Sequence, residues 1–305
     1  MKTVICTVAA FALLSALPAV AGPAAVAPAA TPFHVGKLSL ASISDARFEM
    51  PNDGKVFGVD AGPAAVADVL KAAHAPTDPI VLSVDALLVR DGARVVLIDT
   101  GLGPKAGGAL MASLKLAGIT PDQVTDVLIT HVHPDHIGGL LDAGGQPAFP
   151  KARVRMSSAD WTFLQGQADM AAMVKAIAPQ VSAFEPGAQV TPSITAVAIP
   201  GHTPGHVGYQ IVSGKDRLFD IGDTAHSSII SLAKPDWTMG FDGDAAAART
   251  SRRATLTELA GDHERVFAPH FPYPGVGTIA ASGDGFVWQP AKLTAAPAGK
   301  KKHKP

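Results

Sequence analysis

Four segments that lie far apart in the sequence each place histidine or carboxylate side chains directly after a predicted β-strand. The segments are THVHPDH (130–136), PGHTPGH (200–206), FDIGDT (219–224) and VFAPH (266–270). Histidine and carboxylate groups are common metal ligands. The side chains of the four segments can form one metal site only if the four strands end at the same edge of the fold. This requirement constrains the fold more than any other feature of the sequence.

The predicted secondary structure combines strands and helices along most of the chain. Alternating apolar residues between turn signals predict strands, and apolar spacings of three and four predict helices. The predicted strands are 36–48, 80–90, 93–100, 126–130, 194–200, 207–212, 217–222 and 264–270, and the predicted helices are 64–74, 108–118, 157–178 and 244–261. This order indicates an α/β protein in which two sheets pack together with helices outside.

The composition argues against one large class of function. Apolar residues make up 47% of the 305 residues, which is enough for a large core, and the formal net charge is only −1. Because a protein that binds nucleic acid usually presents a basic surface, no nucleic-acid partner is expected.

The N-terminal residues have the pattern of a secretory leader. Lys2 precedes an apolar stretch, and Ala19-Val20-Ala21 fits the small-residue pattern before a cleavage point. A membrane anchor is the alternative, but the apolar stretch is short for a span and proline and glycine interrupt it. We therefore expect a signal peptide at 1–21, a periplasmic or secreted location in a bacterial cell, and no stable insertion into the membrane.

The remaining chain divides into three predicted parts. Residues 22–32 read as a Pro- and Ala-rich linker, 33–295 as the folded domain, and 296–305 as a basic disordered tail. The single cysteine, Cys6, lies in the leader, so the mature chain has no thiolate and must hold any metal through nitrogen and oxygen. The sequence leaves open whether the protein forms a homodimer.

The histidine segment predicts two neighbouring metal positions. His131 and His133 are two residues apart at a strand end, so both side chains point the same way and can bind one ion. Asp135 and His136 follow Pro134 and can face a second ion. Incidental metal affinity of a His-rich surface is the alternative. His202, Asp223 and His270 after three other strands argue against it, and Asp223 is the natural candidate for a carboxylate that bridges two ions.

These motifs resemble the metallo-β-lactamase-fold hydrolase superfamily. HVHPDH, GHTPGH, IGD and APH occur in this order, and the resemblance covers nearly the whole mature chain from LIDTGLG onward. It implies an αββα sandwich of two mixed sheets packed face to face. The resemblance also implies two divalent metal ions, most often Zn²⁺, with Fe, Mn or Co as alternatives. The implied ligands are His131, His133 and His202 for one ion and Asp135, His136 and His270 for the other, with Asp223 bridging, Asp99 orienting ligands and His206 bracing its loop.

Looser matches favour one branch of the superfamily. SISDARF (42–48), FPYPGVGTI (271–279) and GDGFVWQP (283–290) are similar to methyl parathion hydrolase and quorum-sensing lactonase-like members. We therefore expect hydrolysis of a small ester, lactone or phosphotriester by a hydroxide held between the metals. Asp135 and His226 are the expected catalytic side chains, since lactonases often carry a tyrosine near the position of His226.

Two other functions remain open from the sequence. One is amide or thioester hydrolysis of the β-lactamase or glyoxalase type, and the other is metal binding without catalysis by an exported protein. Asp223 disfavours the β-lactamases, and too few residues follow His270 for the helical domain of the glyoxalase type.

Aromatic side chains are candidates for an apolar substrate pocket. The main candidates are Phe271, Tyr273, Trp161 and Trp237, and Phe163, Phe241 and Trp288 are further ones. Packing in the core is the alternative for each of them. Arg252 and Arg253 on the last predicted helix are expected to face solvent or form salt bridges.

Overall fold

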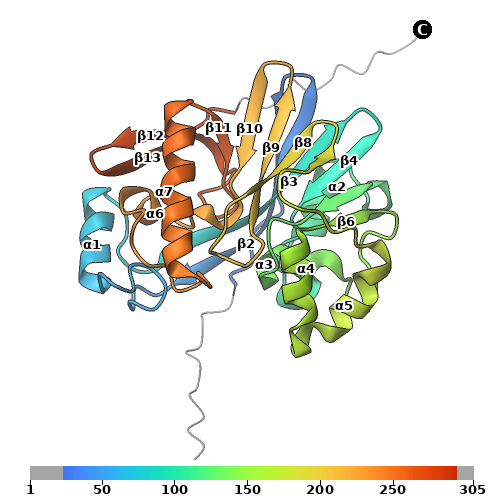
Figure 1. Ribbon diagram of the computed structural model, residues 1–305, viewed down its shortest axis with the longest axis horizontal. Helices are drawn as coiled ribbons and strands as arrows, with labels where there is room; N and C mark the ends of the chain where they lie inside the picture. Colours follow the sequence, from blue (N-terminus) through green and yellow to red (C-terminus); the bar gives the residue numbers. More distant parts are fainter. Residues whose placement is uncertain (1–22, 294–305) are drawn as a thin grey trace, which may run out of the picture.

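Two mixed β-sheets form the centre of the computed structural model, which describes residues 23–293 (Figure 1). The first sheet has six strands in chain order: β1 (Ala30–Val35), β2 (Leu38–Met50), β3 (Ile80–Asp91), β4 (Arg94–Ile98), β5 (Asp126–Leu128) and β6 (Arg153–Arg155). The second has seven strands in the order β13 to β7: β7 (Gln189–Thr191), β8 (Ile194–Ala198), β9 (Val207–Ser213), β10 (Asp216–Asp220), β11 (Arg265–Phe267), β12 (Val276–Ser282) and β13 (Gly285–Pro290). Strand pairs β4–β5, β5–β6 and β10–β11 are parallel, and the other pairs are antiparallel.

An apolar core joins the two sheets. Leu87 and Val96 of the first sheet and Ile194 and Ile211 of the second belong to one buried cluster. Alternating residues of each strand supply this layer, as expected where two sheets pack face to face. The buried Tyr209 hydroxyl on β9 also donates a hydrogen bond of 2.7 Å to the carbonyl of Ile129, next to the histidine segment. The cross-sheet packing thus holds the end of β5 in place.

Helices cover the outer faces of both sheets. The α-helices are α1 (Pro63–Ala72), α2 (Leu110–Leu116), α3 (Pro134–Ile137), α4 (Ser158–Gln165), α5 (Ala171–Ile177), α6 (Ile230–Ala233) and α7 (Ala245–Gly261). Helices α2, α4 and α5 pack on the first sheet, and α7 packs on the second. Figure 1 shows α7 on one side of the strands and α4 and α5 on the other. The predicted αββα sandwich is confirmed.

Several element boundaries differ from the prediction. The helix predicted at 157–178 is divided into α4 and α5 by residues 166–170, which begin with Gly166 at the end of α4. The strand predicted at 126–130 ends at Leu128, because the backbone N–H of Thr130 turns away to the Asp99 side chain. Strands β1, β6, β7, β12 and β13 were not predicted.

The predicted linker is partly structured. Its last residues, 30–32, belong to β1, and Ala24 donates a backbone hydrogen bond of 2.9 Å to the carbonyl of Arg47. The predicted leader (1–21) and the basic tail (296–305) lie outside the described residues. Within residues 23–293, no helix combines the length and apolar character that a membrane span requires.

Candidate metal centre

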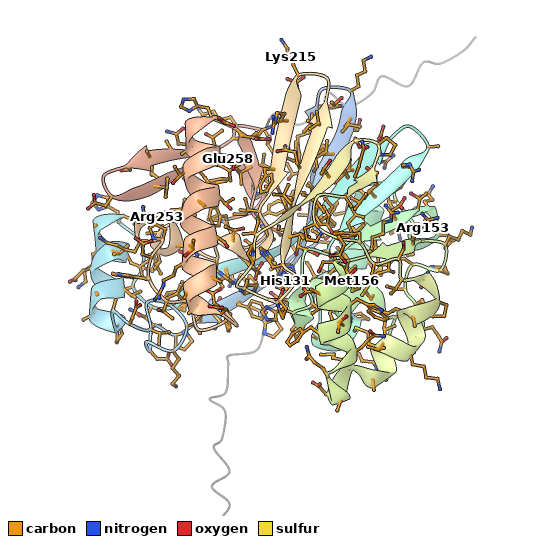
Figure 2. All side chains as sticks on the ribbon, in the orientation of Figure 1. His131, Arg153, Met156, Lys215, Arg253 and Glu258 are labelled. Atoms are coloured by element: carbon orange, nitrogen blue, oxygen red, sulfur yellow. The ribbon has the colours of Figure 1, made fainter. Side chains whose placement is uncertain are left out.

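The seven predicted ligands converge at one end of the two sheets. Their ligand atoms form two groups, each within 4.8 Å: His131, His133, His202 and Asp223 in one, and Asp135, His136 and His270 in the other. Figure 2 places His131 low in the centre, between the half that contains α7 and the half that contains α4. Every segment singled out in the sequence therefore reaches the same place.

Asp223 lies between the two groups, and each of its carboxylate oxygens faces one of them. Oδ2 lies 3.2 Å from Nε2 of His202 and 3.6 Å from Nε2 of His131. Oδ1 lies 3.2 Å from Nε2 of His136 and 3.1 Å from Nε2 of His270. A carboxylate in this position can bind one ion with each oxygen.

The backbone around Asp223 is held by Gly222 and His206. Gly222 has φ of +47°, and a Cβ at this residue would lie 2.7 Å from Nε2 of His206, so a larger residue does not fit. Nε2 of His206 accepts a hydrogen bond of 3.0 Å from the N–H of Asp223, and Nδ1 donates to the carbonyl of Ile199 at 2.9 Å. Burial lowers the pKa of His206 to about 3, so the ring is neutral and can accept. The structure places His206 as a brace and not among the ligands.

Asp99 orients the histidine segment from behind. Its Oδ1 accepts from the N–H of Thr130 at 2.8 Å, and its Oδ2 accepts from the Thr130 hydroxyl and from Nδ1 of His136, both at 2.8 Å. Nδ1 of His131 in turn donates to the Thr130 hydroxyl at 3.1 Å. These bonds place the protons of both rings on Nδ1 and direct the Nε2 lone pairs of His131 and His136 into the site.

Asp160 of α4 ties two ligand segments together, and sequence reasoning did not include it. Its carboxylate accepts from the N–H of Val132 (3.1 Å), from the Thr203 hydroxyl (2.8 Å) and from the N–H of Gly205 (2.7 Å). The one sequence signal that pointed to Asp160 is the Ser-x-x-Asp spacing from Ser157 to Asp160, which is typical of a helix N-terminus.

The buried atoms of the site suit divalent cations. Nε2 of His136, Nε2 of His202 and Oδ1 of Asp223 are buried without a hydrogen-bond partner in the described part of the chain. Burial raises the pKa of the Asp223 carboxyl, but the neighbouring His270, His136 and His131 lower it more, so the pKa lies well below its ordinary value. The distances of 3.1–3.6 Å around Asp223 also resemble the edge of a zinc tetrahedron, about 3.3 Å for metal–nitrogen bonds of about 2.0 Å.

Comparison with known proteins identifies the family. The sequence pattern of the metallo-beta-lactamase superfamily matches residues 79–270, which include all seven ligand candidates. The chain belongs to the metallo-beta-lactamase superfamily. The resemblance stated from the sequence motifs is thereby confirmed.

Two solved structures are similar to this chain over most of its length. The dizinc quorum-quenching lactonase AidC, in complex with the product N-hexanoyl-L-homoserine, superposes with a TM-score of 0.83 at 27% identity and covers 88% of this chain and 99% of its own. The hydrolase AbOPH superposes with a TM-score of 0.81 at 26% identity, with the same coverage. Among curated relatives, the uncharacterized protein YobT of Bacillus subtilis is 31% identical over 141 residues, 43% of this chain and 58% of YobT.

A cavity of about 360 Å³ opens beside the ligands of this superfamily member. It is lined partly by Asp135, Asp223, His270 and other site residues and partly by an apolar wall. The wall consists of Phe48, Met50, Leu82, Leu102 and Phe241. A second cavity of about 490 Å³ shares His133 and Phe241 with the first and is lined further by Phe163, Pro204 and Ala247.

His226 borders the first cavity next to the bridging carboxylate. Its Nε2 lies 3.1 Å from Oδ2 of Asp223, and its ring stacks on His270 with 5.5 Å between the ring centroids. The structure thus brings His226 to the site although it is not in either ligand group.

The four main aromatic candidates for the substrate pocket are corrected by the structure, since none of them lines either cavity. Phe271 is fully buried and contacts Trp288 in the core beneath α7. Although it follows His270 directly, the chain turns here, and the N–H of Phe271 donates to the carbonyl of Ala268 at 3.2 Å. The hydroxyl of Tyr273 is bound to the Thr31 side chain at 2.8 Å, away from the site.

The two tryptophan candidates pack against apolar clusters. Trp161 packs against the core between α4 and the first sheet, and Trp237 packs against the cluster beside α1. Phe163 and Phe241, weaker candidates in the sequence, do line cavities, and Phe48 was missed.

For Arg252, the expected salt bridge is confirmed and the alternative of a solvent-facing side chain is wrong. Its side chain is buried rather than solvent-facing, and it pairs with Asp242 at 2.7 Å. Arg253 does form an exposed salt bridge, with Asp236.

Proposed function

We propose that this protein is a dinuclear-metal hydrolase that cleaves a small ester bond, with a lactone as its preferred substrate. The observation that carries the proposal is the position of Asp223, whose two oxygens face two separate groups of ligands. We propose Zn²⁺ for both positions, because the donors are imidazole and carboxylate groups, and zinc is the commonest metal for such sets.

The residues of the site would have separate roles in hydrolysis. Two bound divalent cations supply a nucleophile from water near neutral pH and polarise the substrate carbonyl. Asp99 and His206 hold the ligand segments, so the geometry does not have to form during the reaction. The side chain of Asp135 is 17% exposed and lines the cavity, so its free oxygen can take up the proton of the attacking water.

His226 is proposed to assist the leaving group. It lines the cavity from the side of Asp223, and both ring nitrogens lack a well-directed hydrogen-bond partner in the described residues. An N–H of this ring can donate a hydrogen bond to the oxygen that leaves when the C–O bond breaks. The proton held by Asp135 then completes the alcohol product.

The cavities support an ester with an apolar acyl group. The apolar wall of the first cavity would contact the acyl chain while the carbonyl lies over the ligands. The second cavity, which shares His133 and Phe241 with the first, would receive the alcohol part. The similarity to the dizinc lactonase AidC favours a lactone over a phosphotriester.

A substrate panel on the zinc-loaded protein tests this proposal. We expect turnover of acyl homoserine lactones and p-nitrophenyl esters, and less turnover of paraoxon. Turnover of β-lactams or thioesters in place of esters, or no turnover with two zinc ions bound, would reject it. The Asp223→Ala variant should lose at least one zinc ion and most activity. The Asp216→Ala variant changes an exposed residue of β10, the strand that precedes Asp223, and should retain both.

The His226→Phe variant separates leaving-group assistance from metal binding. We expect it to bind two zinc ions and to slow the hydrolysis of alkyl esters and lactones more than that of p-nitrophenyl esters, because p-nitrophenolate leaves without a proton donor. An equal effect on both substrate classes would remove His226 from this role.

A further inference from the structure

We infer that Asp242 and Arg252 are positioning residues for His202, and that they set the affinity of the His131, His133 and His202 position for its cation. This inference rests on the proposed metal centre. Neither residue belongs to the two ligand groups, and neither was expected at the site from the sequence.

Asp242 connects the ligand to the arginine. Its Oδ1 accepts a hydrogen bond of 3.0 Å from Nδ1 of His202, and its Oδ2 accepts one of 2.7 Å from Nη2 of Arg252. The side chains of Asp242 and Arg252 are only 0% and 2% exposed. The ion pair is therefore dry and its geometry is fixed.

The remaining donors of Arg252 are also used. Nε donates to the carbonyl of Thr224 at 2.8 Å, and Nη1 donates to the carbonyls of Pro235 and Trp237 at 3.1 and 3.2 Å. Thr224 directly follows Asp223, so one buried guanidinium contacts the backbone beside the bridging carboxylate and the carboxylate behind His202. Buried charges are tolerated when they are paired and hydrogen-bonded in this way.

The carboxylate determines how His202 can act. By accepting from Nδ1–H, Asp242 keeps the proton on that nitrogen and leaves the lone pair on Nε2, which lies 3.2 Å from Oδ2 of Asp223. A carboxylate behind a histidine also makes the ring a better donor to a metal, and losing such a partner typically weakens metal affinity about 10–100-fold.

The backbone of this segment has its own support, so a change of the Asp242 side chain can be interpreted. The N–H of Gly243 donates to the carbonyl of His202 at 3.1 Å, and the N–H of Asp244 donates to that of Gly201 at 2.8 Å. These bonds remain in the Asp242→Asn variant, which has nearly the same volume as the wild type.

The chain offers a matched control on the same helix and loop. Arg253 and Asp236 also form an ion pair, but their side chains are 41% and 59% exposed and contact no ligand. The Asp236→Asn variant therefore removes a carboxylate from an equivalent pair without touching His202.

Competition between the full-length protein and a chelating dye for Zn²⁺ tests the inference without any substrate. We expect the wild type to bind two zinc ions, and the Asp242→Asn variant to bind one of them about 10–100-fold more weakly. The Asp236→Asn variant should match the wild type. Unchanged affinity for both ions in Asp242→Asn overturns the inference, whereas a wild type that binds no zinc overturns the proposed function itself.

A second measurement reads the histidine ring directly. In metal-free protein, ¹⁵N chemical shifts should show His202 protonated on Nδ1 in the wild type and as a mixture of ring forms in Asp242→Asn. The Arg252→Lys variant keeps a cation beside Asp242, so it should retain the wild-type ring form even if it is less stable. If Asp242→Asn keeps the wild-type ring form, Asp242 does not position His202.

Discussion

Phe48 offers a test of how the proposed enzyme selects its acyl group. The residue lies on β2, is partly exposed, and forms part of the apolar wall of the cavity beside the ligands. Replacing it by alanine removes a phenyl ring from this wall. Because Phe48 is only partly buried, the Phe48→Ala variant should fold.

The size of the expected effect follows from the burial of methylene groups. Each methylene that enters an apolar wall contributes about 0.8 kcal/mol, which corresponds to about a fourfold change in kcat/KM. From a butanoyl to a hexanoyl ester, the wild type should thus gain about 15-fold. In the Phe48→Ala variant, water reaches one side of the acyl chain of the ester. We therefore expect the gain in kcat/KM from butanoyl to hexanoyl ester to fall to about fourfold.

Steady-state rates on a series of straight-chain p-nitrophenyl esters measure this gain. The Phe163→Ala variant is the control, because Phe163 lines the second cavity and not the first. Its gain per methylene should equal that of the wild type. The assignment of the acyl group to the first cavity is refuted if Phe48→Ala keeps the full gain, or if Phe163→Ala is the variant that loses it.

Three further predictions concern the core and the site. The Phe271→Ala variant should lose about 3–5 kcal/mol of unfolding free energy in a denaturant titration and keep its acyl-chain preference; loss of that preference at full stability would return Phe271 to the pocket. The Asp160→Ala variant leaves buried donors of two ligand segments unpaired, so it should lose about 3 kcal/mol and bind zinc more weakly; unchanged zinc affinity would show that these ties do not shape the site. Burial lowers the pKa of His270, but Asp223 and Asp135 raise it more, to about 9 in the metal-free protein; zinc binding at pH 8 should therefore release ~1 proton or more and strengthen as the pH rises to 9, and binding heats that do not depend on the ionisation enthalpy of the buffer would contradict this.

The seven ligands could be predicted because each lies in a short motif beside a recognisable strand. Local patterns fix the strands, and the need for strands to end at one rim brings the motifs together. The ends of elements were less predictable. β5 stops at Leu128 because a side chain 31 residues away in the sequence captures the N–H of Thr130.

The residues that support the ligands could not be predicted in the same way. Asp242 contacts His202, 40 positions away in the sequence, and Asp160 contacts Thr203, 43 positions away. Such contacts have no periodic pattern. Arg252 lies on a helix where an arginine usually faces solvent. It is buried because two distant loops supply carbonyl and carboxylate acceptors, and only the folded chain shows this.

Two other errors have different causes. Strands β12 and β13 carry an alternating pattern around the turn at Gly283, but these residues were interpreted only as similarity to a family. The pocket prediction for Phe271 used nearness in sequence to His270, although the Phe271 ring is buried in the core cluster beneath α7.

Diffraction at the zinc absorption edge, from crystals grown with zinc, tests the central claim most directly. We expect two anomalous peaks per chain, one beside each carboxylate oxygen of Asp223 and about 3.5–4 Å apart. A single peak, or two peaks of which neither contacts Asp223, would contradict it.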